Sequence, residues 1–403
     1  DGIEPPTLVA PSKALVIWPL MGAKSSLSVP LLCTNAQLRS GGYVRHNLWI
    51  TCLQAFWSAI IKSSSNGFER RRNMTATVQT LLSTLHRHGL RRKDVSRILP
   101  DWWNDELTST ASGAQQARIY LAKALSLRFR ALSEMPPRIE FELPDERRFK
   151  LSARTTESDV TLAVALARSA SKITLSAFDT PFRAPSEAAA DIRAEILAAG
   201  NPWVGLSQLA DYCWNHGIPV IHLASPLLGR KMDGIAMSMS GRPSIVLSSK
   251  RRSGFLLFHL AHELGHIALG HVGRNGAIVD DEIKEEAEGQ ARDPQEIAAD
   301  HFAIELLTGN AHGKLALQSY VKADVLARLA IQYGRDKNID PTHVVLNCAH
   351  NDKAAFPLFV SAANKIGGEE SDQQFIAARL FSYISENLKP DSEFLLRNLI
   401  GQE

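Results

Sequence analysis

Apolar residues recur with the period of an α-helix along most of this chain. The segment 294–307 is the clearest example, because its apolar positions follow the spacing i, i+3, i+4 and i+7 of one buried stripe. The residues of this stripe are Ala299, Phe302, Ala303, Leu306 and Leu307. Similar patterns predict helices over 78–88, 91–99, 113–132, 158–170, 186–197, 206–215, 255–270, 321–333, 375–388 and 392–399, and a helix start at Asp340 and Pro341.

Three short aliphatic segments interrupt this helical pattern before residue 250. They span 218–223, 233–239 and 243–249, and glycine-containing turns bound them. Residues 139–143 are a candidate for one further strand. The predicted fold class is therefore α+β, mostly helical, with a small three-stranded sheet.

The composition is that of an ordinary globular protein. The chain has 403 residues, 45% hydrophobic and 22% charged, which is enough for two or three domains. The formal net charge of +3 is too small to indicate nucleic-acid binding by itself. The cysteines are scattered without a CxxC pair, which argues against a disulfide framework and fits a reducing cytoplasm. They are Cys33, Cys52, Cys213 and Cys348.

The first 73 residues differ from the rest, with few acidic residues and no clear amphipathic period. The apolar segment 47–61 is shorter than the roughly 20 residues that a membrane-spanning helix needs. We interpret 1–73 as an extension of little structural value, with Met74 as the functional start. A membrane anchor is the alternative.

The predicted helices 78–88 and 91–99 flank Gly89 and suggest a helix-turn-helix module. The acidic segment 101–106 follows where a DNA-reading helix would meet phosphates, and its charge opposes DNA binding. We favour a degenerate module used for protein contacts over one that recognises DNA. Trp102 and Trp103 are then core or interface anchors.

The candidate chemistry lies in the predicted helix 255–270, which contains the motif HExxH. His262 and His266 are one helical turn apart on the same face, so both can bind one metal ion. Glu263 lies about 100° further round, close enough to act on a water molecule at that metal. Neutral imidazoles suit zinc, and two histidines with one more ligand leave a fourth position open. The alternative is a buried helix whose two histidines are satisfied by backbone carbonyls.

A third ligand is available from the predicted helix 294–307. Glu296 and Asp300 are one turn apart and flank its apolar stripe. Glu296 could complete a His₂Glu zinc site, and Asp300 could accept the second ring N–H of a ligating histidine. The alternative for Glu296 is an exposed acid in a first helical turn, where the helix dipole favours negative charge.

Other candidate third ligands fit less well. A metzincin needs a histidine six residues and a glycine three residues past the second motif histidine, where this chain has Val272 and Leu269. His271 is one position too early, so that class is excluded. We expect the acidic run 280–288 to be solvated and His301 to lie on the surface or near the ligands.

The motif HELGHIALGH followed by ExxADxFAxxLL resembles the ImmA/IrrE family of metallo-endopeptidases, over residues 203–309. The resemblance implies a gluzincin-like, that is zincin-like, peptidase domain with one zinc ion per chain. It implies His262, His266 and Glu296 as ligands and Glu263 as general base. In such folds the strand nearest the active-site helix is an edge that can pair with an extended substrate.

The resemblance does not identify the residue that stabilises the oxyanion, for which His271 and His222 are candidates. Composition, the predicted elements and the resemblance together suggest the following regions: an atypical N-terminal extension (1–73), a small helical domain that could be the degenerate helix-turn-helix module (74–135), a helical connector (136–200), the zinc metallopeptidase domain (201–310) and a helical C-terminal domain (311–403).

The resemblance implies a zinc-dependent endopeptidase in the bacterial cytoplasm. Its substrate would be a specific intracellular protein such as a helix-turn-helix repressor or antitoxin, in stress, phage-defence or mobile-element regulation. Direct nucleic-acid binding and membrane association are not favoured. The alternative is a non-catalytic regulatory or toxin-like binding protein, with the peptidase domain as a platform. The intact motif favours the enzyme, since a structural zinc site needs four protein ligands.

Overall fold

The computed structural model describes residues 79–402, with gaps at 89, 91, 101, 105, 107–109, 135, 151–156, 225–231, 250–253, 281–292 and 368–370. The predictions for 1–73, for the turn at Gly89 and for most of the acidic run 280–288 lie outside the described residues. Everything described below lies within residues 65–403, which belong to one compact unit. No helix in the described ranges combines the length and the apolar character that crossing a membrane requires.

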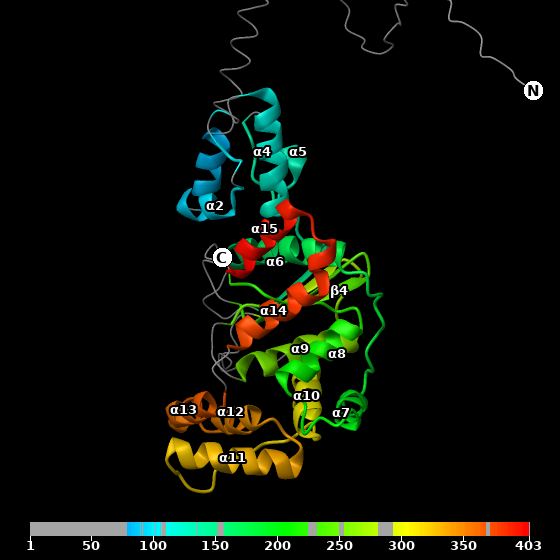
Figure 1. Ribbon diagram of the computed structural model, residues 1–403, viewed down its shortest axis with the longest axis vertical. Coiled ribbons are helices and arrows are strands. Elements are labelled where there is room, and N and C mark those ends of the chain that lie inside the picture. The colour runs from blue at the N-terminus through cyan, green and yellow to red at the C-terminus, as the bar shows by residue number, and fades with distance from the viewer. Residues whose placement is uncertain are drawn as a thin grey trace, which may run out of the picture. The chain divides into compact units, whose positions relative to one another are not determined.

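The described residues form one five-stranded sheet and many helices (Figure 1). The strands are β1 (Glu146–Lys150), β2 (Val220–His222), β3 (Gly234–Met239), β4 (Arg242–Leu247) and β5 (Gly276–Asp280). The helices include α2 (Arg92–Ile98), α4 (Ala111–Ala124), α5 (Phe129–Leu132), α6 (Glu157–Ala177), α7 (Ala189–Ala198), α8 (Leu206–Asn215), α9 (Phe255–Ala268), α10 (Pro294–Thr308), α11 (Ala323–Lys337), α12 (Pro341–Asn351), α13 (Phe356–Ile366), α14 (Asp372–Ile384) and α15 (Pro390–Ile400). The predicted α+β, mostly helical class is confirmed.

The sheet is larger than the three strands predicted. Its order is β1-β5-β3-β4-β2, so β1 and β5 are additions, whereas β2, β3 and β4 match the predicted segments. The predicted strand at 139–143 is wrong, because that segment makes only one isolated bridge, between Phe141 and Leu127. The strand forms a few residues later as β1, which pairs parallel to β5 across a long stretch of chain.

The sheet order also corrects the expectation about an edge strand. The motif helix α9 packs against β3 and β4. Strand β3 is paired antiparallel on both sides, with β4 and with β5. The strand nearest this helix is therefore central, and a substrate could not pair with it without displacing β5.

The sheet separates two apolar cores because alternate strand residues face opposite sides. Ile235 and Val246 point into a core that also contains side chains of α4, α6 and α15. Ile245 and Leu247 point into a second core with α7, α8, α9 and α10. A third core joins α11, α12 and α13. The predicted domain boundaries and the helix-turn-helix module stay predictions.

Helix α10 begins and ends where its sequence predicts. The Asp293 side chain accepts a hydrogen bond from the Gln295 N–H, and Pro294 occupies the first turn, where no N–H is needed. Gly309 ends the helix with a φ of 79°.

A single buried arginine joins three helices. Arg193 of α7 donates from Nη1 to the carbonyls of Leu306 and Leu307 at 3.1 and 3.0 Å. Its Nη2 donates to the carbonyls of Lys337 and Asn338 at 3.3 and 2.7 Å. These carbonyls lie at the ends of α10 and α11, where intrahelical partners run out and the helix dipole favours a cation.

A second buried group, His343 of α12, lies against α9. Its ring is nearly parallel to that of Phe258, with an interplanar angle of 7° and centroids 6.3 Å apart. Burial lowers the pKa of His343 to about 4, and the positive charge of Arg193 acts in the same direction. The imidazole is therefore neutral in the folded protein at neutral pH.

We expect Arg193→Met to lower the free energy of unfolding by about 3 kcal/mol, because buried carbonyls lose charged hydrogen bonds while the apolar stem is kept. Chemical denaturation measures this. Arg128→Met is the matched control, since the Arg128 side chain is 61% exposed and pairs with Glu140 at the surface. That variant should change stability by less than about 1 kcal/mol. Equal effects would contradict the assignment.

We expect the free energy of unfolding to decrease as the pH is lowered, because His343 is buried in its neutral form. The folded pKa of about 4 lies below the unfolded value of 6.5, so the unfolded chain takes up the proton more readily. The contribution is complete above pH 6.5 and decreases as the pH falls towards 4. Between pH 7 and 4 the wild type should lose about 3 kcal/mol more than His343→Leu. Parallel pH profiles from denaturant titrations of the two proteins would contradict this.

Candidate metal centre

The motif helix α9 and the helix α10 pack closely side by side (Figure 1). Gly265, within the motif, makes this approach possible. A Cβ on Gly265 would lie 3.0 Å from Cδ1 of Phe302 on α10. Because α10 can come this near, its first turn reaches the face of α9 that carries the two motif histidines.

Three side chains from these helices converge inside the protein. The Nε2 atoms of His262 and His266 are 3.1 Å apart. Glu296 places Oε2 3.4 Å from Nε2 of His262 and Oε1 3.5 Å from Nε2 of His266. All three side chains are buried, and their ligand atoms could hold one metal ion. The structure thus brings together the residues that the sequence predicted as ligands.

The spacing of these atoms fits zinc. A tetrahedral zinc ion with bonds of about 2.0–2.1 Å holds neighbouring ligand atoms roughly 3.3–3.4 Å apart. The observed separations of 3.1 to 3.5 Å are close to that value. Imidazole nitrogen and carboxylate oxygen are also the donor types that zinc prefers.

The far side of each imidazole has its own polar neighbour. Asp300 places Oδ1 2.9 Å from Nδ1 of His262. His271 places Nδ1 3.0 Å from Nδ1 of His266. If each ligand ring donates its Nδ1–H to that neighbour, each Nε2 presents a lone pair to the centre. The structure places Asp300 where the sequence suggested, one turn after Glu296.

The two histidines considered for the oxyanion each have a polar neighbour. His271 folds back behind His266, because α9 ends and the chain turns at Gly270 with a φ of 70°. This position brings its ring beside the imidazole of His266. His222 is on the edge strand β2, with Nε2 3.0 Å from the carbonyl oxygen of Ser249. The ring of His301 contacts that of His312, 4.9 Å away and nearly perpendicular to it.

Glu263 lies beside the ligands on the next face of α9 and is 1% exposed. Its side chain packs against Gly234, the first residue of β3. Sequence reasoning missed Gly234 and the neighbouring polar pair of Asp233 and His259. A glycine at the start of a predicted strand was the available signal, but its partner on α9 could not be identified from the pattern.

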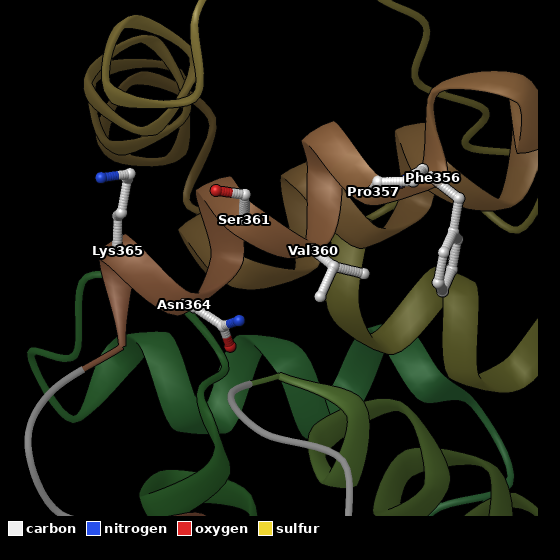
Figure 2. Close-up of a pocket in the computed structure, with 6 residues that line it drawn as sticks. All are labelled: Phe356, Pro357, Val360, Ser361, Asn364 and Lys365. Atoms are coloured by element: carbon white, nitrogen blue, oxygen red, sulfur yellow. The ribbon is translucent and has the colours of Figure 1, made fainter.

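An open pocket of about 570 Å³ lies apart from this centre, on α13. Figure 2 shows its six lining side chains, all from this helix, with Phe356 near one end and Lys365 near the other. The ammonium of Lys365 pairs with Asp324 at 2.7 Å. No metal ligand lines this pocket, so it is not part of the candidate metal centre.

We expect elemental analysis of purified protein to find about one zinc per chain in the wild type. His266→Ala and Glu296→Ala should lose it, because two remaining ligands cannot complete the site. Asp300→Asn should keep all three ligands but weaken zinc binding by about 10- to 100-fold, since it alters the partner of the His262 ring. A zinc-free wild type after zinc loading, or full zinc in Glu296→Ala, would contradict the assignment.

Comparison with known proteins places the centre in a family. Residues 213–334 match the family model of peptidase M78, described as the IrrE N-terminal-like domain. This range contains β2, β3, β4, β5, α9 and α10, and so the three converging side chains and Glu263. No curated protein and no solved structure matches the chain. Residues 213–334 are therefore a domain of the ImmA/IrrE family, as the motifs indicated.

Proposed function

We propose that this protein is a zinc-dependent endopeptidase that cleaves one or a few specific proteins inside the cell. The observation that carries the proposal is the buried His262, His266 and Glu296 group with Glu263 beside it. A structural zinc site takes four protein ligands, whereas the three that converge among the described residues leave a position for reacting groups. The match to a peptidase family supports the same conclusion.

Each side chain has a defined task in this proposal. His262, His266 and Glu296 would hold the zinc ion, which when bound polarises a carbonyl and lowers the pKa of water. Asp300 and His271 keep the two imidazole rings in the required orientation and tautomer.

Glu263 moves the proton. Its carboxylate accepts a proton from the attacking water as the new carbon–oxygen bond forms. It then returns that proton to the amine nitrogen as the carbon–nitrogen bond of the peptide breaks. Atoms and charges balance over the cycle, because one water is consumed and Glu263 ends as it began.

The substrate that we propose is a helix-turn-helix repressor or antitoxin, on the strength of the family resemblance. Cleavage would then switch on genes of stress response, phage defence or mobile elements. We place the reaction in the bacterial cytoplasm. The free thiols of Cys213 and Cys348 fit a reducing compartment.

We expect Glu263→Gln to keep about one zinc per chain and to lower cleavage at least 100-fold, because it removes the general base and leaves the ligands. Comparing new protein N-termini by mass spectrometry, in cells expressing wild type or variant, measures this. Glu146→Gln is the control, since Glu146 is exposed on β1 and is not among the possible metal ligands.

Cleavage at the wild-type rate by Glu263→Gln would show that its role is wrong. A biological effect that persists in this variant without cleavage would favour the alternative, a binding protein that uses the peptidase domain as a platform.

A further inference from the structure

The residue proposed as general base is confined by the start of a strand. A Cβ on Gly234 would lie only 2.8 Å from both Cγ and Cδ of Glu263. Gly234 is not among the glycines with positive φ, so its backbone suits other residues equally well. The absence of a side chain at this position is therefore needed for the space that Glu263 occupies.

The backbone of Gly234 is held in place because Gly234 belongs to β3, a strand that is paired on both sides. It is in register with Leu247 of β4 on one side and with Asp280 of β5 on the other. A central strand cannot shift without breaking pairing on both sides. The Glu263 side chain thus packs against a part of the backbone that the sheet holds in place.

A buried polar pair lies next to this contact. Asp233 directly precedes Gly234, and His259 is one turn before Glu263 on the same face of α9. Oδ1 of Asp233 is 3.7 Å from Nε2 of His259, and the two residues are 6% and 7% exposed. Neither belongs to the group of possible metal ligands. The pair and the Gly234–Glu263 contact join the same two elements, β3 and α9, at adjacent points.

We propose that Gly234, Asp233 and His259 are positioning residues for Glu263. Gly234 sets how closely the Glu263 carboxylate approaches β3, and the Asp233–His259 pair sets where the start of β3 lies relative to α9. This inference rests on the proposed function, since it concerns how the general base Glu263 is positioned. The position of this carboxylate is important because a general base acts only within about 3 Å of the proton that it accepts. A displacement near 1 Å can reduce the rate about 100-fold.

The test uses the full chain loaded with zinc, and acetohydroxamic acid as the probe. This small zinc chelator has an acidic N–OH proton that a carboxylate beside the metal can accept. Its Kd, measured by calorimetry, therefore reports the position of Glu263 without a peptide substrate. Glu263→Gln calibrates the assay and should weaken binding about 10-fold or more, the loss expected for a charge-assisted hydrogen bond.

Gly234→Ala should keep about one zinc per chain and yet weaken acetohydroxamate binding about 10-fold, as Glu263→Gln does, because the added Cβ displaces the carboxylate. Gly273→Ala is the matched control. A Cβ there would also meet a glutamate carboxylate, 2.5 Å from Oε2 of Glu146, but Glu146 is exposed and free to move. We expect its Kd to stay within about twofold of wild type.

His259→Gln tests the Asp233–His259 pair independently. It also provides a test of the proposal if Gly234→Ala does not fold. It should weaken acetohydroxamate binding about fivefold in the wild type and add no further loss to Glu263→Gln, because both changes act through one carboxylate. An equal loss in both backgrounds would overturn its positioning role. An unchanged Kd in either folded, zinc-loaded variant, Gly234→Ala or His259→Gln, would overturn the role of that residue.

The results that would contradict the proposed function differ from those that would contradict only the positioning role. A wild type that takes up no zinc, or a Glu263→Gln variant that binds acetohydroxamate as tightly as wild type, removes the role of Glu263 and this inference with it. Weak binding by Glu263→Gln together with wild-type binding by Gly234→Ala and His259→Gln removes only the inference.

Discussion

Two imidazole nitrogens and a carboxylate face one another within 3.5 Å inside this protein, and the ImmA/IrrE domain is arranged around that contact. When the outer ring nitrogens donate to Asp300 and His271, the inward-facing atoms carry only lone pairs. Such atoms repel one another, and burial removes the water that would solvate them. A cation among them turns this repulsion into attraction. Zinc would therefore contribute to the stability of the fold as well as to its chemistry.

The two helices that carry the ligands, α9 and α10, are themselves held in place by polar contacts. The backbone N–H of Gly254, at the start of α9, donates to the Asp372 side chain at 3.0 Å. Arg193 binds the carbonyls at the far end of α10. Between these points, Gly265 lets the two helices approach. The ligands are thus fixed by the packing of the helices that carry them, and His271, in the turn after α9, holds the ring of His266.

Much of the site could be predicted because its chemistry is local. Helical periodicity puts His262 and His266 on one face, and the apolar stripe of α10 places Glu296 and Asp300 beside it. Pairing between distant segments could not be predicted in the same way. Strands β1 and β5 and the central place of β3 depend on such pairing. The fold-back of His271 depends on a turn, and the contact of Glu263 with Gly234 depends on how a helix packs on the sheet.

The burial of the centre also affects how the metal itself comes and goes. His262, His266 and Glu296 are 2%, 0% and 5% exposed, so a bound ion could leave these three ligands only when α9 and α10 separate locally, although its fourth position would stay open to reacting groups. Loss of the ion would then be no faster than that opening. A chain that has acquired zinc would retain it through short periods of zinc shortage, and its occupancy would reflect past supply more than present supply.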